Sequence, residues 1–244
     1  MASRKIGVIG DRFARPLVSG LGPPGFVTVP GSGSTELALE LRQGNLDCAF
    51  LSPIEYARDY RLYEILPEVA AVSEGPSGLV LLLFREGGRT ISTIAADPRS
   101  GSEIVLAHIV LAEKYETVPR VVPYAGSPGE AFRKADGVLL FGDAAEDNRD
   151  GKKAIDLIDE WGDIAEVPYV HGFWVVRRDV FTTGEARKFI RLSSSGTGKA
   201  AETAGIRYTL DEAAISGLTE FFRMAYYHGV LRDIPDIRLF ALDP

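Results

Sequence analysis

Short apolar segments alternate with helical segments in two parts of this chain, and this alternation strongly limits the folds that it can form. In the first part, residues 5–9, 26–29 and 48–51 are predicted strands, with helical apolar spacing between the last two. A second strand-helix unit covers residues 94–141. Repeated strand-helix-strand units form parallel sheets that are covered by helices. We therefore predict an α/β protein with two lobes and a cleft between them.

The predicted chain crosses between the two lobes twice. This arrangement gives a discontinuous first lobe, residues 1–84 plus 177–244, and a second lobe, residues 85–176. A chain of 244 residues is long enough to give both lobes a buried core. Ligands of α/β proteins bind in clefts between domains and at the carboxyl ends of parallel strands. We therefore expect the functional site where these two places coincide.

One loop lies at the carboxyl end of a predicted strand and leads into a predicted helix. Residues 97–102, with the sequence DPRSGS, follow a predicted strand and precede a helical pattern over about residues 101–115. The hydroxyl group of Ser100 or Ser102 can cap this helix. The small side chains would also let an anion approach the free N–H groups of the first helical turn. Two interpretations follow, an ordinary serine-capped helix and a binding site for a small carboxylate.

Serine, glycine and aspartate gather at the predicted strand ends, so these loops form the candidate binding surface. The candidate ligand-binding residues are Asp11, Phe13, Arg15, Ser52, Ser77, Gly78, Ser100, Gly101, Ser102, Asp143 and His171. Two of them are also candidate catalytic residues. Asp143 could act as a base or orient a hydroxyl group, although Gly-Asp is also a common turn sequence. His171 could donate a hydrogen bond to a carboxylate or exchange a proton.

The overall charge restricts the class of partner. The chain has 27 Lys and Arg residues against 34 Asp and Glu residues, a formal net charge of −7, and no long basic block. This balance argues against nucleic acid or an anionic membrane surface as the main partner. A small anion stays compatible with an acidic protein, because local N–H groups and a few arginines can hold it. We expect a small-molecule carboxylate ligand.

The hydropathy pattern bears on location. No apolar run in the sequence approaches the length of a transmembrane helix, so we predict no membrane span. The first residues lead directly into the strand at 5–9, without the apolar stretch and cleavage site of a signal peptide. The expected location is the cytoplasm.

The residues typical of metal and cofactor sites are sparse. The single cysteine, Cys48, lies in an apolar predicted strand and is expected to be a buried structural thiol. His108, His171 and His228 are not spaced as metal ligands. The Gly-Ser-Gly sequence at residues 31–33 does not complete a dinucleotide-binding fingerprint. We expect neither a metal nor a cofactor.

Taken together, several segments resemble one enzyme family in both content and order. These segments are residues 6–8, 16–17, 44–56, 65–76, 97–102, 139–145, 168–174 and 217–218, together with Trp161, Phe221 and Gly229. They resemble the chorismate dehydratase family of the futalosine pathway of menaquinone biosynthesis. The resemblance implies a type II periplasmic-binding-protein fold used by a cytoplasmic enzyme. It also implies a dicarboxylate in the interlobe cleft and loss of water from chorismate to give 3-[(1-carboxyvinyl)oxy]benzoate.

The chain differs from the usual family pattern at the predicted cleft. Phe13 stands where the family usually has an asparagine that is implicated in the chemistry, and a phenylalanine ring cannot position a proton. At Ser77-Gly78 and at His171, the residues of this chain also differ from those that the family usually has there. Three functional hypotheses follow. The leading one is a chorismate-dehydratase-like lyase; the others are a non-catalytic binding protein for a small carboxylate or aromatic acid, and a related enzyme that uses Asp11, Asp143 or His171 as a base on a different carboxylate.

Overall fold

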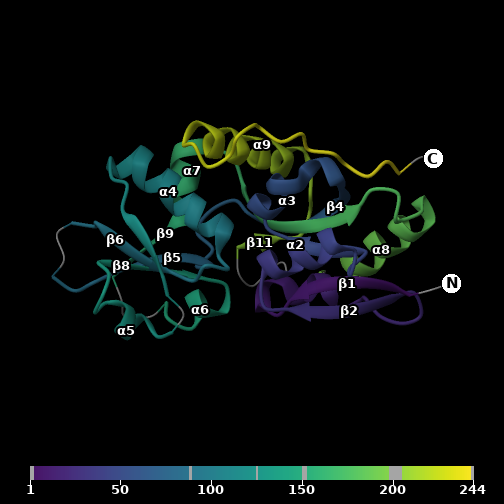
Figure 1. Ribbon diagram of the computed structural model, residues 1–244, viewed down its shortest axis with the longest axis horizontal. Coiled ribbons are helices and arrows are strands. Elements are labelled where there is room, and N and C mark those ends of the chain that lie inside the picture. Colours follow the sequence, from purple (N-terminus) through teal and green to yellow (C-terminus); the bar gives the residue numbers. More distant parts are fainter. Residues whose placement is uncertain (1–2, 88–89, 125, 150–152, 198–204, 243–244) are drawn as a thin grey trace.

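The computed structural model describes residues 3–87, 90–124, 126–149, 153–197 and 205–242, and these form two sheets that lie in separate lobes (Figure 1). The six-stranded sheet has the order β11-β4-β10-β3-β1-β2. Its strands are β1 (Arg4–Ile9), β2 (Phe26–Gly31), β3 (Cys48–Leu51), β4 (Tyr63–Ser73), β10 (Tyr169–Arg177) and β11 (Ile206–Arg207). The five-stranded sheet has the order β7-β6-β8-β5-β9. Its strands are β5 (Val80–Phe84), β6 (Thr93–Ala96), β7 (Arg120–Pro123), β8 (Gly137–Phe141) and β9 (Ala154–Asp156).

Helices cover both sheets. The helices that follow the first-sheet strands are α1 (Arg15–Val18), α2 (Ser34–Gln43), α3 (Pro53–Asp59), α8 (Thr183–Ser195) and α9 (Glu212–Tyr227), with the short 3-10 turns η1 (Arg12–Ala14) and η2 (Tyr60–Leu62). Those of the second lobe are α4 (Gly101–Tyr115), α5 (Pro128–Ala131), α6 (Asp143–Glu146) and α7 (Leu157–Ala165). Helix α9 packs against β10, α3 and α4, and so bridges the two lobes along one side of the molecule (Figure 1).

The strand directions confirm the predicted α/β class. Strand β1 pairs in parallel with β2 and β3, and β6 pairs in parallel with β7 and β8. These are the strands that the repeated strand-helix pattern predicted. Strands β10 and β5 run antiparallel to their neighbours, so both sheets are mixed rather than purely parallel.

The predicted lobe boundaries differ from the observed sheet membership. The division into residues 1–84 plus 177–244 and residues 85–176 assigned β5 to the first lobe and β10 to the second. Strand β5 instead pairs with β8 and β9, and β10 pairs with β3 and β4. The chain therefore changes sheets before β5 and again before β10. Both strands are almost continuously apolar and buried, so their sequences carry no sign of which sheet they join.

Buried apolar and aromatic side chains hold the central strands of the six-stranded sheet in place. Every residue of β3 is buried, including Cys48, and burial raises the pKa of its thiol well above its usual value, as expected for a structural cysteine. Strand β10 lies in the middle of its sheet, and Trp174 packs edge-on against Phe50 and Phe189.

Within the described ranges, no helix has the length and apolar character needed to cross a membrane.

Candidate functional site

A cavity of about 420 Å³ lies where loops from the two lobes face each other; we call it the interlobe cavity. Its first-lobe walls come from the loops after β1 and β2, from the end of β3 and from β10. Its second-lobe walls come from β6, from β8 and from the loops that follow them. The charged and aromatic side chains in these walls include Asp11, Phe13, Phe50, Asp97, Arg99, Glu103, Phe141, Asp143 and His171.

The predicted site residues divide into two groups. Those that line the interlobe cavity are Asp11, Phe13, Ser52, Ser100, Asp143 and His171. Those that do not are Arg15, Ser77, Gly78, Gly101 and Ser102. Strand ends therefore pointed to six residues that line this cavity, but they did not separate residues that face the cavity from residues that shape the loops around it.

The serine-capped helix is the clearest correction. Neither Ser100 nor Ser102 caps α4 with its side chain. Ser102 is fully buried instead, and its Oγ accepts a hydrogen bond from the backbone N–H of Ile54 at 3.0 Å. This bond joins the first turn of α4 in the second lobe to the first turn of α3 in the first lobe.

Ser77 and Gly78 shape the chain just before β5. The Ser77 Oγ accepts from the N–H of Leu79 at 3.3 Å. Gly78 has a φ of +70°, a conformation that favours glycine, and its N–H donates to Asp156 Oδ2 at 2.6 Å. Both residues therefore act on the local backbone rather than on the cavity.

Arg12 links the two lobes at the edge of the cavity, whereas the neighbouring Arg15 does so only loosely. The backbone N–H of Arg12 donates to Asp143 Oδ1 at 2.7 Å, and its guanidinium lies 3.1 Å from Glu146 and also pairs with Asp147. Arg12 comes from the first lobe, whereas its three acidic partners lie on or next to α6 of the second. The neighbouring Arg15 is 66% exposed, and its nearest carboxylate contact is 3.9 Å from Asp143.

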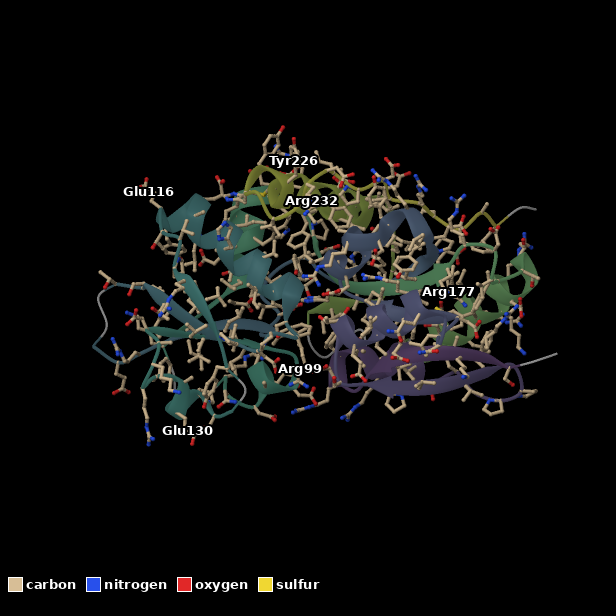
Figure 2. All side chains as sticks on the ribbon, viewed as in Figure 1. Arg99, Glu116, Glu130, Arg177, Tyr226 and Arg232 are labelled. Atoms are coloured by element: carbon tan, nitrogen blue, oxygen red, sulfur yellow. The ribbon has the colours of Figure 1, made fainter. Side chains whose placement is uncertain are left out.

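Among the described residues that line the interlobe cavity, Arg99 is the one lysine or arginine. Figure 2 shows it between the two lobes. Its Nε lies 3.0 Å from the carboxylate of Asp97, and its Nη1 donates to the carbonyl oxygen of Ser32, in the first lobe, at 3.1 Å. Arg99 holds the pKa of Asp97 below its usual value through these hydrogen bonds. The charge of Arg99 is therefore partly neutralised but remains at the cavity wall.

Asp11 and Asp143 form a second polar group in the cavity wall. The backbone N–H of Asp143 donates to Asp11 Oδ1 at 3.2 Å. Burial raises the pKa of Asp11, and the charge of Asp143 adds to the rise. Gly142 allows this approach, because a Cβ at its positive φ of 59° would collide with the Asp11 carboxylate.

His171 lies at the buried end of the cavity. It is 1% exposed, and its Nε2 lies 2.9 Å from Ser73 Oγ, while Nδ1 has no partner among the described residues. Burial lowers the pKa of His171 to about 3, so the imidazole is neutral near pH 7. His171 can therefore offer a hydrogen bond to a ligand, but not a positive charge.

Three phenylalanine rings give the cavity an aromatic wall. Phe13 is buried, with its ring centroid 5.3 Å from that of Phe141 and 6.4 Å from that of Phe50. The imidazole of His171 continues this cluster at 5.9 Å from Phe13. Such a wall can pack against a flat or cyclic ligand.

Glu103 is a further cavity residue that was not predicted from the sequence. This residue lies in the first turn of α4, is 2% exposed, and lines the interlobe cavity. Burial, together with the charges of Asp11 and Glu55, raises the pKa of Glu103 to about 8. A signal was present in the sequence, because Glu103 shares a helix face with Ala107 and Val110, which are both buried. Among the described residues, no group of three or more His, Cys, Asp or Glu side chains is arranged to hold a metal ion.

Solved structures share this fold at low sequence identity. Protein AF1704 from Archaeoglobus fulgidus matches with a TM-score of 0.70 and 16% identity, covering 94% of this chain and 98% of that one. The CA3427 gene product of Candida albicans, described as having the generic periplasmic-binding-protein fold, matches with a TM-score of 0.69 and 13% identity, covering 100% and 99%. The alkanesulfonate-binding protein SsuA from Xanthomonas axonopodis pv. citri, bound to MOPS, matches with a TM-score of 0.64 and 15% identity, covering 96% of each chain.

These similarities confirm the predicted periplasmic-binding-protein fold. A family model described as menaquinone biosynthesis matches residues 5–202, which is most of the chain. This match includes the loops that form the interlobe cavity. The protein therefore belongs to the menaquinone-biosynthesis family, which includes the chorismate dehydratases.

Proposed function

We propose that this protein binds a small cyclic carboxylate in the interlobe cavity and eliminates water from it, with chorismate as the candidate substrate. The observation that carries this proposal is the pairing of an aromatic wall with one guanidinium in the same cavity. Phe13, Phe50 and Phe141 provide surfaces for a ring, and Arg99 provides a cation for a carboxylate. The family match supports a role in menaquinone biosynthesis.

The elimination makes modest demands on the protein. One proton must leave a ring carbon, another must reach the departing hydroxyl group, and the ring must be held while both move. Loss of water from chorismate gives an aromatic ring, which supplies much of the driving force. Asp11, Asp143 and Glu103 are the carboxyl groups in the cavity wall that could move these protons.

The charge of the cavity has to suit an anionic substrate. Four carboxyl groups and one guanidinium line it: Asp11, Asp97, Glu103, Asp143 and Arg99. Burial raises the pKa of Glu103 to about 8, so this group is mostly protonated near pH 7, unlike an exposed carboxylate. This protonation reduces the repulsion that a dicarboxylate would otherwise meet.

A direct assay tests the proposal. The purified protein is incubated with chorismate, and the products are followed by mass-resolved chromatography beside a protein-free control. We expect protein-dependent loss of one water and formation of 3-[(1-carboxyvinyl)oxy]benzoate. Chorismate that decays at the protein-free rate would refute the proposed reaction.

Phe13 favours a second candidate function, binding without catalysis. Its ring fills the position where the resembling enzymes usually carry an asparagine, and it offers no group that can move a proton. The similar protein SsuA binds a sulfonate, which is also a small anion. On this hypothesis, carboxylates or sulfonates raise the melting temperature but are recovered unchanged. A Phe13→Asn variant that gains dehydration activity would show that the ring had blocked the reaction.

A further inference from the structure

Glu103 has a buried oxygen without a protein partner. The side chain is 2% exposed, it lines the interlobe cavity, and its Oε1 has no hydrogen-bond partner in the described part of the chain. Buried polar atoms are almost always hydrogen-bonded, because leaving one unpaired costs about 1–3 kcal/mol. An unpaired carboxyl oxygen in a cavity wall therefore indicates a group that a ligand completes.

The groups around Glu103 keep it neutral. Asp11 from the loop after β1 and Glu55 from α3 both act on it as negative charges. Glu55 is itself engaged, since its Oε1 accepts from Thr35 Oγ1 at 3.0 Å and lies 2.6 Å from Nη1 of Arg58. Burial and like charges thus favour the protonated carboxyl group of Glu103.

The phenol of Tyr169 on β10 completes these surroundings. Its Oη is buried and also lacks a partner among the described residues. Burial raises the pKa of Tyr169 well above its usual value, and an ionised Glu103 would raise it further. A neutral phenol beside a neutral carboxyl group adds no positive charge that would ionise Glu103.

We propose that Glu103 is the catalytic acid and base of the interlobe cavity, and this role rests on the elimination proposed above. The carboxyl group gives its proton to the departing hydroxyl oxygen, and the carbon–oxygen bond breaks with its electron pair leaving in the water molecule. The resulting carboxylate takes the proton from the adjacent ring carbon, whose bonding pair becomes the new carbon–carbon double bond. Glu103 ends protonated, so the cycle consumes no other reactant.

The other carboxyl groups of the wall are less suited to this role. Asp143 Oδ1 is occupied by the N–H of Arg12 at 2.7 Å, and Asp11 Oδ1 by the N–H of Asp143 at 3.2 Å. Asp97 is paired with Arg99. Of these four carboxyl groups, Glu103 is the one with a fully buried oxygen that has no hydrogen-bond partner in the described part of the chain.

The test compares Glu103→Gln with wild type, using chorismate as the probe. Gln keeps the size of the side chain but can neither give nor recover the proton. We expect kcat to fall by about 10²–10⁴-fold, the usual contribution of a positioned acid or base, while KM changes by no more than about threefold. The matched control is Glu116→Gln, at the exposed C-terminal end of the same helix, with an expected kcat equal to that of wild type.

A second measurement does not need turnover. The infrared spectrum of wild type near pH 7 should contain the carbonyl band of a protonated carboxylic acid, which Glu103→Gln lacks and Glu116→Gln retains. Wild-type turnover together with an undiminished kcat in Glu103→Gln would overturn the role of Glu103 and leave the proposed function standing. Absence of the infrared band would also overturn it. A wild-type protein that leaves chorismate intact would overturn the proposed function, and this role with it.

Discussion

The buried carboxyl group of Glu103 makes the stability of this protein depend on pH in a specific direction. A glutamate in the unfolded chain has a pKa near 4.5, whereas the folded protein holds the pKa of Glu103 at about 8. Between these pH values the folded state binds a proton that the unfolded state has released. The contribution of Glu103 to the free energy of unfolding must therefore fall as pH rises, by about 1.4 kcal/mol per pH unit.

The substitution Glu103→Gln removes this pH dependence. Near pH 7, about two and a half units above the unfolded pKa, the linkage penalty in wild type amounts to roughly 3 kcal/mol. Relative to wild type, the variant should therefore gain about 1.4 kcal/mol in unfolding free energy for each pH unit between about 5 and 8. Gln keeps the volume of the side chain, so a change in packing would add a constant offset and leave this slope unchanged.

Urea denaturation at several pH values measures the slope. The unfolding free energies of wild type, Glu103→Gln and Glu116→Gln are compared between about pH 5 and 8. The exposed control loses one carboxylate from the same helix, and its curve should run parallel to that of wild type. A difference between Glu103→Gln and wild type that stays flat over this range would show that Glu103 is ionised in the folded protein, and the reasoning would fail.

Three further substitutions probe the contacts around the cavity. Ser102→Ala leaves the buried N–H of Ile54 without its acceptor and should lower the unfolding free energy by about 1–3 kcal/mol in urea denaturation; no loss would contradict a structural role for this hydroxyl. Gly142→Ala forces a Cβ toward Asp11 at positive φ and should lower the free energy of unfolding by about 1–3 kcal/mol. A melting temperature equal to that of wild type would contradict this cost. Arg99→Ala should weaken chorismate binding about tenfold in calorimetry, and equal affinity would exclude Arg99 from recognition.

Local patterns were sufficient to predict much of the fold. The parallel strands β1, β3, β6 and β8 are short apolar runs that end at turn residues, and the helices between them show apolar residues at helical spacing. Sheet membership of β5 and β10 could not be predicted in the same way. Both strands are buried along nearly their whole length, so their partners are decided by tertiary packing rather than by alternation in sequence.

The candidate site shows the same division between local and tertiary information. Asp11, Ser52 and Asp143 follow strand ends, and the topology brings those ends together at the cavity. Ser102 belongs to a similar loop, but its direction depends on how closely α3 approaches α4. The raised pKa of Glu103 comes mainly from burial and, beyond that, from the charges of Asp11 and Glu55, which lie 92 and 48 positions earlier in the chain. Sequence spacing alone contains no information about that desolvation.

The chemistry proposed for Glu103 depends on contact between the lobes. Glu103 lies in the second lobe, while Asp11 and Glu55, which help to raise its pKa, come from the first. Separation of the lobes would admit water to the carboxyl group and move those charges away, and both changes lower its pKa toward that of an exposed glutamate. The contacts of Arg12 with α6 and of Arg99 with Ser32 hold the lobes together at the edge of the cavity. Contact between the lobes therefore keeps this carboxyl group protonated in the wall of the interlobe cavity.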